Sequence, residues 1–166
     1  VYTSNTGYTA EYARMLGEKT GLPVYTLDEA KKSLPNNAPV LYLGWLMAGS
    51  IKGYGVAARQ FNLRAVCGVG LTLTSSKKLR EQNNIPQTVT VFSLQGGFDM
   101  ERLHGVHKLL MKVLRASLQS NMAKKKQPDN AEKVMLRILN EGGSFVSEAH
   151  LSGMLDWIQK EQKLNG

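Results

Sequence analysis

Short apolar runs alternate with segments of helical periodicity along the chain, a pattern typical of a parallel sheet covered by helices. The run at 40–44 is continuous and apolar, as expected of a central strand. Further strands are predicted at 1–2, 23–27, 64–69 and 88–94. The pattern therefore predicts an α/β fold with a doubly wound, five-stranded parallel sheet and helices on both of its faces.

The segments between these runs predict the helices. The first, at 9–20, stops at Gly21, because glycine readily adopts the left-handed conformation that ends a helix. The longest, at 100–119, carries a stripe of leucines and valines that we expect to pack on the sheet. Further helical segments are expected at 28–33, 53–61, 77–82, 131–139 and 147–160. We expect one domain over residues 1–166, with the start of the first strand lying before Val1.

The composition is that of a soluble globular chain, with 42% hydrophobic and 20% charged residues. No apolar run reaches the roughly 18 residues that span a bilayer. The single cysteine, Cys67, lies in an apolar run at 65–69, and we expect it to be a buried, inert thiol. One cysteine forms no internal disulfide, so we expect a protein of the reducing cytoplasm.

The net charge of +8 is concentrated in one stretch. Residues 102–128 include seven basic residues and no acidic ones. A solvated helix face is one interpretation of this stretch, and a docking patch for an acidic redox partner is another. Attachment to an anionic membrane surface is a third. No recognised nucleic-acid-binding module is present, so we expect no nucleic-acid partner.

A polar turn follows the first predicted strand and precedes the first helix, with the sequence Ser4-Asn5-Thr6-Gly7-Tyr8-Thr9. The hydroxyls of Ser4, Thr6 and Thr9 and the main-chain amides of the turn can donate hydrogen bonds to a phosphate. The helix N-terminus adds a favourable dipole, and Gly7 allows close approach because it has no Cβ. The turn contains no lysine or arginine, which excludes a P-loop and favours a phosphate monoester held by neutral donors.

This turn resembles the phosphate loop of the flavodoxin family, Ser/Thr-x-Thr-Gly-x-Thr, at every fixed position. The resemblance implies a flavodoxin-like sheet of strand order 2-1-3-4-5 and a non-covalently bound FMN, held at its phosphate end by residues of the turn. A second segment is similar to the branch of the family that contains menaquinone-dependent protoporphyrinogen dehydrogenase. This segment is Gly97-Phe98-Asp99, followed by Leu103, His107, Leu109 and Met111.

The same resemblance implies that two further loops hold the isoalloxazine ring of FMN. The expected contacts are Trp45, Leu46, Met47, Ala48 and Gly49 in the loop at 45–50, and Gly70, Leu71 and Thr72 in the loop at 70–74. Trp45 offers a flat surface for stacking, and packing within the fold is its alternative role. Leu46, Met47 and Leu71 would keep water away from one side of the ring.

We therefore expect an FMN-binding electron-transfer protein that works with a redox partner protein. An FMN-dependent oxidoreductase acting on a porphyrinogen or a quinone is one alternative, and a flavin-free binding module of the same fold is another. No catalytic residue is assigned, because Asp99 and Glu101 after the fifth predicted strand belong to no constellation of acids and bases. No residues are spaced as a set of metal ligands.

Overall fold

The computed structural model describes residues 1–103, 105–124 and 129–165. Contacts within the chain group these residues into two compact units. The sheet unit comprises Val1–Gly96 and Phe145–Gly166, and the inserted unit comprises Gly97–Ser144. The chain therefore leaves the sheet unit once and returns to it once.

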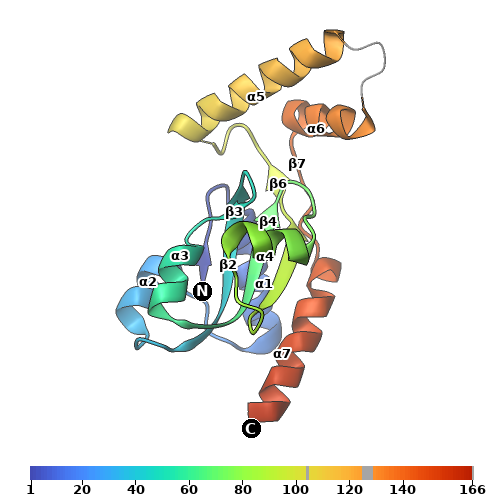
Figure 1. Ribbon diagram of the computed structural model, residues 1–166. Coiled ribbons are helices and arrows are strands. Elements are labelled where there is room, and N and C mark those ends of the chain that lie inside the picture. Colours follow the sequence, from blue (N-terminus) through green and yellow to red (C-terminus); the bar gives the residue numbers. More distant parts are fainter. Residues whose placement is uncertain (104, 125–128, 166) are drawn as a thin grey trace. The chain divides into compact units, whose positions relative to one another are not determined.

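A mostly parallel sheet organises the sheet unit (Figure 1). Its parallel strands follow the order β1-β2-β4-β5, and β3 pairs with β2 in the antiparallel sense. The bounds are β1 (Tyr2–Thr3), β2 (Pro39–Met47), β3 (Ser50–Ile51), β4 (Asn62–Gly70) and β5 (Thr90–Gln95). The predicted α/β class and the predicted apolar central strand are confirmed, since β2 has a parallel neighbour on each side.

The register of the strands aligns their carboxyl ends. Thr3 of β1 pairs with Gly44 of β2, Gly44 pairs with Gly68 of β4, and Gly68 pairs with Ser93 of β5. In open parallel sheets this edge is where ligands bind. The loops that follow β1, β2, β4 and β5 therefore begin along one edge of the sheet.

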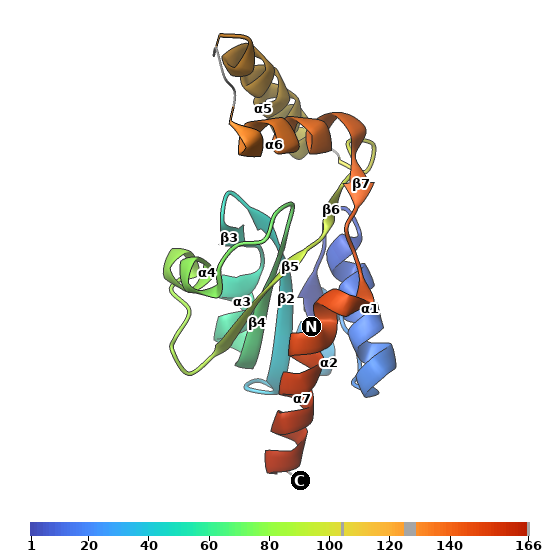
Figure 2. The ribbon, with the colours of Figure 1, turned by 90° about the vertical axis from the view of Figure 1, so that its right-hand side faces the viewer.

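Helices cover both faces of the sheet, as predicted (Figure 2). Residues of α2, α3 and α4 pack on one face, and residues of α1, η1 and α7 pack on the other. The bounds are α1 (Tyr8–Thr20), α2 (Leu27–Ser33), α3 (Tyr54–Gln60), α4 (Ser76–Asn83), η1 (Glu148–Leu151) and α7 (Ser152–Asn165). The alternation of side chains along each strand supplies both cores, so the central strands are apolar on both sides.

Cys67 lies in the core beneath α1 and α7 and is fully buried. Burial raises the pKa of its thiol, so the sulfur stays protonated. The expectation of a buried, inert thiol is confirmed.

The first helix ends as predicted. Gly21 has a left-handed backbone with φ 71°, and its N–H donates to the Gly17 carbonyl at 2.8 Å. Tyr12, in the same helix, is fully buried and donates its hydroxyl proton to the Gln95 carbonyl at 2.7 Å. The Tyr12 oxygen also lies 3.0 Å from His150 Nδ1, and because its only proton is already donated, Nδ1 must be the donor. Tyr12 thus joins α1 to β5 and η1.

The prediction of a strand at 23–27 is wrong. Only Thr26 forms a bridge, in parallel to Tyr2, and the Tyr2 N–H donates to the Tyr25 carbonyl at 2.9 Å. Thr26 instead caps α2 in a capping box with Glu29, which competes with extended pairing.

The described residues of the inserted unit form two helices and a short two-stranded sheet. Its elements are β6 (Gly97–Phe98), α5 (Gly105–Lys124), α6 (Asn130–Glu141) and β7 (Gly143–Ser144). β6 and β7 pair in the antiparallel sense and bring the two ends of the unit together. The buried apolar residues of this unit are Phe98, Leu103, Ile138 and Leu139. Residues 104 and 125–128 of the predicted basic stretch lie outside the described residues.

The stripe at 100–119, which is expected to pack on the sheet, lies in the inserted unit and not in the sheet unit. The helix there, α5, has no buried residue, and the core on that side of the sheet is completed by Leu151, Met154 and Ile158. Apolar residues at helical spacing show that a helix has an apolar face, but they do not identify what covers that face. Among the described residues, no helix is both long enough and apolar enough to cross a membrane.

A buried hydroxyl network supports the start of the loop after β1. The Tyr42 hydroxyl donates to the Lys52 carbonyl at 2.7 Å and lies 2.6 Å from Thr3 Oγ1, which must therefore be the donor in that contact. Tyr42 is fully buried, and this burial raises the pKa of its hydroxyl from 10.0 to about 12. A Cβ at Gly53 would overlap the hydroxyl, so glycine is required there.

We expect Tyr42→Phe to lower the free energy of unfolding by about 1–3 kcal/mol, because the Lys52 carbonyl and the Thr3 hydroxyl would lose a buried partner. Urea unfolding followed by circular dichroism measures this change. The matched control is Tyr25→Phe, since no hydrogen bond of the Tyr25 hydroxyl occurs within the described part of the chain. Equal stability of the two variants would contradict the role of the network.

The raised pKa of Tyr42 also predicts a pH dependence of stability. Between pH 10 and about 12 the unfolded chain loses this proton while the folded protein retains it, so stability should fall as pH rises through that window. The stability contributed by the neutral hydroxyl is fully present below pH 10. Urea midpoints measured across this window should fall less steeply for Tyr42→Phe than for the wild-type protein.

Candidate functional site

The turn between β1 and α1 forms the first part of the candidate site. Gly7 has a left-handed backbone with φ 95°, and its N–H donates to Ser4 Oγ at 3.1 Å. Gly7 occupies the N-cap position of α1, and no side chain caps the helix there. The first amides of α1 have no partners within the helix, so this end of α1 can accept an anion.

Thr9 carries a free hydroxyl at this helix end. The residue is only 2% exposed, yet none of the hydrogen bonds among the described residues involves its hydroxyl. Among the described residues, every fully buried side-chain oxygen has a hydrogen-bond partner. The Thr9 hydroxyl has none, so it must reach the surface. Asn5 is exposed, and its side chain likewise has no partner among the described residues. Both groups are available to a ligand.

Thr6 and Tyr8, unlike Asn5, are at least partly buried against the rest of the fold. Thr6 is half-buried, and Tyr8 is buried beside the end of β5, where a Cβ at Gly96 would lie 3.3 Å from the Tyr8 Cβ. Local chain geometry thus brings Ser4–Thr9 together, with hydroxyls and amides on one turn.

A hollow of about 510 Å³ adjoins the turn. It is lined by Tyr2, Thr3, Ser4, Asn5, Gly7, Ala10, Thr26, Leu27 and Asp28. Asp28 is the one acidic residue in this lining, and its carboxylate lies 3.5 Å from Lys31 Nζ, which offsets its charge. Of the turn, Ser4, Asn5 and Gly7 line this hollow, whereas Thr6, Tyr8 and Thr9 do not.

The second predicted loop is a β-hairpin. Trp45, Leu46 and Met47 form the end of β2, and Met47 pairs with Ser50 of β3. The prediction of a loop beginning at Trp45 is therefore wrong, because the chain continues past the end of β1 as a strand that pairs with β3. By the register of β1 and β2, Trp45 lies at the level of Ser4.

Trp45 and Leu46 point to opposite faces of the sheet, as neighbouring residues of a strand do. The Leu46 side chain lies over Gly68 and Gly70, where an added Cβ would lie 3.1 Å and 2.9 Å from its methyl groups. Leu46 thus packs with the core beneath α4. Trp45 is half-buried on the face that carries α1.

The hairpin turn is held by a side chain from α4. Ala48 and Gly49 both have a left-handed backbone, with φ 49° and 82°. Asn83 Nδ2 donates to the Gly49 carbonyl at 2.9 Å, and Asn83 Oδ1 accepts from the Ile51 N–H at 2.8 Å. A Cβ at Gly49 would overlap the Gln82 side chain. The turn therefore has one defined backbone conformation.

The loop after β4 is tied to β5. The Gly70 carbonyl accepts from the Gly96 N–H at 2.8 Å, and the Leu71 carbonyl accepts from Gln95 Nε2 at 3.1 Å. Thr72 is exposed, so it is open to a ligand or solvent. The Phe145 N–H donates to the Gly96 carbonyl at 2.8 Å, so the chain leaves and re-enters the sheet unit at the carboxyl end of β5.

Three residues that shape this edge were missed in the sequence: Tyr42, Asn83 and Gln95. Each holds a loop through a partner distant in sequence. Asn83 and Gly49, for example, are separated by 34 positions. Hydrophobic periodicity carries no signal for such contacts. The one signal in the sequence was Tyr42, a residue with a polar hydroxyl inside an otherwise aliphatic run.

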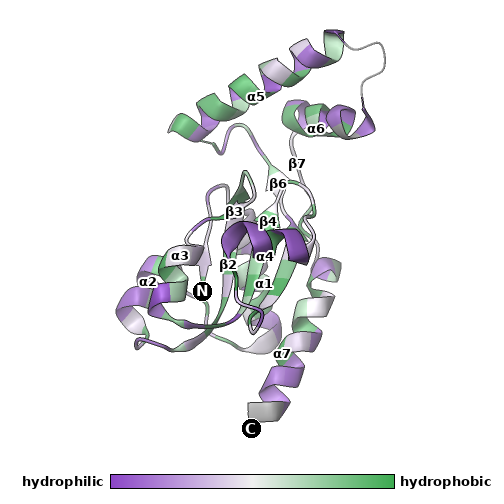
Figure 3. Ribbon diagram, in the orientation of Figure 1, coloured by the Kyte–Doolittle hydropathy of each residue, from purple (hydrophilic) through white to green (hydrophobic). Residues whose placement is uncertain are grey.

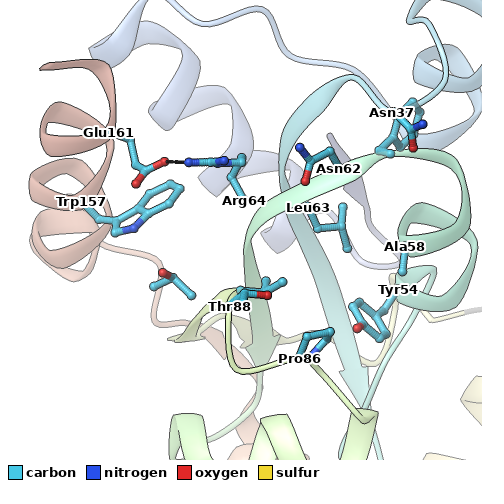
Figure 4. Close-up of a pocket in the computed structure, with 13 residues that line it drawn as sticks. Asn37, Tyr54, Ala58, Asn62, Leu63, Arg64, Pro86, Thr88, Trp157 and Glu161 are labelled. Carbon is cyan, nitrogen blue, oxygen red and sulfur yellow. Dashed lines mark hydrogen bonds and ion pairs between the residues drawn. The ribbon is translucent and has the colours of Figure 1, made fainter. Parts of the chain in front are cut away.

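A second hollow lies at the opposite end of the sheet, where β4 and β5 begin (Figure 4). It has a volume of about 590 Å³ and lies beside the ion pair of Arg64 with Glu161, at 2.6 Å. The charge of Arg64 is thereby neutralised, and the hollow lacks the converging donors seen at the turn after β1. We therefore place the candidate site at the carboxyl edge.

The carboxylates that follow β5 are paired with cations. Asp99 lies 3.2 Å from Arg102, and Glu101 lies 3.6 Å from Lys108. Within the described ranges, no three His, Cys, Asp or Glu side chains gather as a metal site would require.

Comparison with known proteins finds no matching family model, curated protein or solved structure for this chain. The resemblance to flavodoxins therefore stays a prediction carried by the residues of the turn.

We expect Ala48→Asn to raise the free energy of unfolding by about 0.5–1 kcal/mol, because asparagine tolerates the left-handed backbone and Asn-Gly is favoured in such two-residue turns. Urea unfolding measures the change. Ala58→Asn, at an exposed position of α3, is the control and should lower stability through helix propensity. A loss of stability in both variants would contradict the assigned turn geometry.

Proposed function

We propose that this protein binds FMN non-covalently at the carboxyl edge of its sheet and acts as an electron-transfer flavoprotein. The observation that carries the proposal is the unpartnered Thr9 hydroxyl at the uncapped end of α1, within a turn that has the complete flavodoxin-type pattern. A phosphate monoester requires such a set of neutral donors.

The phosphate would be held by the turn Ser4–Thr9. The hydroxyl of Thr9, the side chain of Asn5 and the first amides of α1 are the donors that remain available. The left-handed Gly7 allows the backbone to curve around an anion. The turn contains no lysine, so neutral hydrogen-bond donors would hold the phosphate dianion. The α1 dipole adds to the attraction.

The flavin ring would lie across the neighbouring strand ends. Trp45 is at the level of the phosphate turn, and the hairpin turn at Ala48 and Gly49 and the loop from Gly70 to Thr72 belong to adjacent strands. Asn83 and Gln95 hold these two loops, so the ring would meet a preorganised surface. Met47 and Leu71 are half-buried and would limit the access of water.

The order of the strands supports a flavodoxin-like fold. β1, β2, β4 and β5 are neighbours in that order, and the segment around Thr26 meets β1 on its other side. We propose that this isolated bridge occupies the place of the outer strand in the flavodoxin order 2-1-3-4-5, although no strand forms there. The site would then lie at the switch point of the sheet.

FMN, when bound, supplies one- and two-electron redox chemistry. Among the described residues of the sheet unit that line the hollow at the turn, Asp28 is the one carboxylate, and it is paired with Lys31 rather than placed as an acid or base. This favours an electron carrier over the alternative, an FMN-dependent oxidoreductase acting on a quinone or porphyrinogen. Turnover of either substrate without a protein acceptor would favour the alternative.

The charge around the proposed ring loops favours an acidic redox partner. Residues 45–52 and 70–78 contain no aspartate or glutamate and include Lys52, Lys77 and Lys78. Complementary charge steers such encounters and speeds association at low salt. We place this exchange in the cytoplasm, in keeping with the single buried thiol.

We expect Thr9→Val to weaken FMN binding about 10- to 100-fold, because the variant removes one hydrogen bond to a charged phosphate and preserves side-chain volume. Quenching of FMN fluorescence measures the affinity, and riboflavin, which has no phosphate, should bind both proteins equally. The control is Thr20→Val, at the other end of α1, where the hydroxyl donates to the Leu16 carbonyl. Absence of FMN binding by the wild-type protein would refute the proposal and favour a flavin-free module.

A further inference from the structure

The outer face of α5 is an exposed apolar stripe. It consists of Val106, Leu109, Leu110, Val113 and Leu114, which are 78%, 63%, 49%, 59% and 40% exposed. Their spacing of three and four residues places them on one side of the helix. Figure 3 shows this apolar character in the amino-terminal part of α5. A row of exposed aliphatic residues of this length marks an interaction surface rather than ordinary surface scatter.

The other side of α5 is already occupied within the inserted unit. α5 packs against α6, and Met111 and Leu118 of α5 are half-buried. These residues lie on the side of the helix away from Leu109 and Val113, at 100° per residue. Within the inserted unit, the packing of the two helices therefore leaves the outer face of α5 uncovered.

The charge of α5 is of one sign. Its twenty residues include Lys108, Lys112, Arg115 and Lys124 and no acidic residue. Lys112 and Lys124 are exposed. A partner for this helix must therefore accept both aliphatic side chains and several cations.

We propose that the outer face of α5 docks on the interface of a lipid bilayer that contains anionic lipids. An amphipathic helix lying in the plane of the interface buries its aliphatic side chains at the level of the acyl chains, and its lysines reach the anionic headgroups. A second copy of this chain fits less well, because it would bring two cationic helices together. A nucleic acid would leave the aliphatic stripe in water.

The length of α5 is sufficient for this role. Its twenty residues extend for about 30 Å, so the helix can present five aliphatic side chains to one planar surface. The inference rests on the exposed stripe and the charge of α5, and it does not require FMN binding. The two proposals can therefore fail separately.

The test is co-sedimentation of the full chain with vesicles of phosphatidylcholine alone or with about 30% phosphatidylglycerol. We expect binding to the vesicles with phosphatidylglycerol, little binding to the neutral vesicles, and at least a 10-fold weakening in about 0.5 M salt, where the Debye length is about 4 Å. Hydrogen exchange should show protection on vesicles within residues 105–124.

Two pairs of variants separate the apolar and the charged contributions. Leu109→Ser with Val113→Ser should weaken binding at least about 10-fold, because both side chains are exposed in the free protein and buried in the interface. Leu22→Ser with Val56→Ser, two exposed apolar residues of the sheet unit, is the control and should bind normally.

Lys112→Gln with Lys124→Gln should weaken binding about 10-fold at low salt. Lys32→Gln with Lys160→Gln removes the same charge from exposed positions of the sheet unit and should have little effect. The proposal would be overturned by equal binding to vesicles with and without phosphatidylglycerol, or by no binding to either. Unchanged binding of the double serine variant would also overturn it. So would a stable dimer that Leu109→Ser with Val113→Ser dissociates.

Discussion

The parallel pairing of β2 with β1 on one side and with β4 on the other is the constraint on which the rest of the structure depends. It aligns Thr3, Gly44, Gly68 and Ser93 across four strands, so that the loops after these strands share one edge. Hydrogen bonds between parallel strands require this alignment, because every buried backbone group needs a partner. The turn after β1, the hairpin after β2 and the loop after β4 would not face a common ligand in any other register.

Polar side chains then give the loops of this edge a defined conformation. Tyr42 connects β1 to the segment after the hairpin, Asn83 holds the hairpin turn, and Gln95 holds the loop after β4. A buried polar group is costly without its partner, so each of these contacts favours one loop arrangement over others. The cost of ordering the edge is therefore met during folding, and a ligand would find its donors already in place.

The inserted unit and the sheet unit differ in how their aliphatic side chains are exposed to solvent. The sheet unit buries its aliphatic residues on both faces of the sheet, whereas α5 leaves a row of them in solvent. Both ends of the insertion join the sheet unit at Gly96 and Phe145, beside the carboxyl end of β5. The insertion therefore enters and leaves the sheet unit at the end of one strand.

The sequence by itself determined the α/β class, the central strand, the helix that ends at Gly21 and the polar turn from Ser4 to Thr9, because these depend on local periodicity and backbone preference. It did not determine that 23–27 fails to form a strand, that Trp45 belongs to a hairpin, or that α7 rather than α5 completes the core on the sheet. Those outcomes depend on which surfaces meet in three dimensions. An apolar stripe has the same spacing whether a sheet, a second helix or a membrane covers it, so only the tertiary structure could show that the stripe on α5 is exposed.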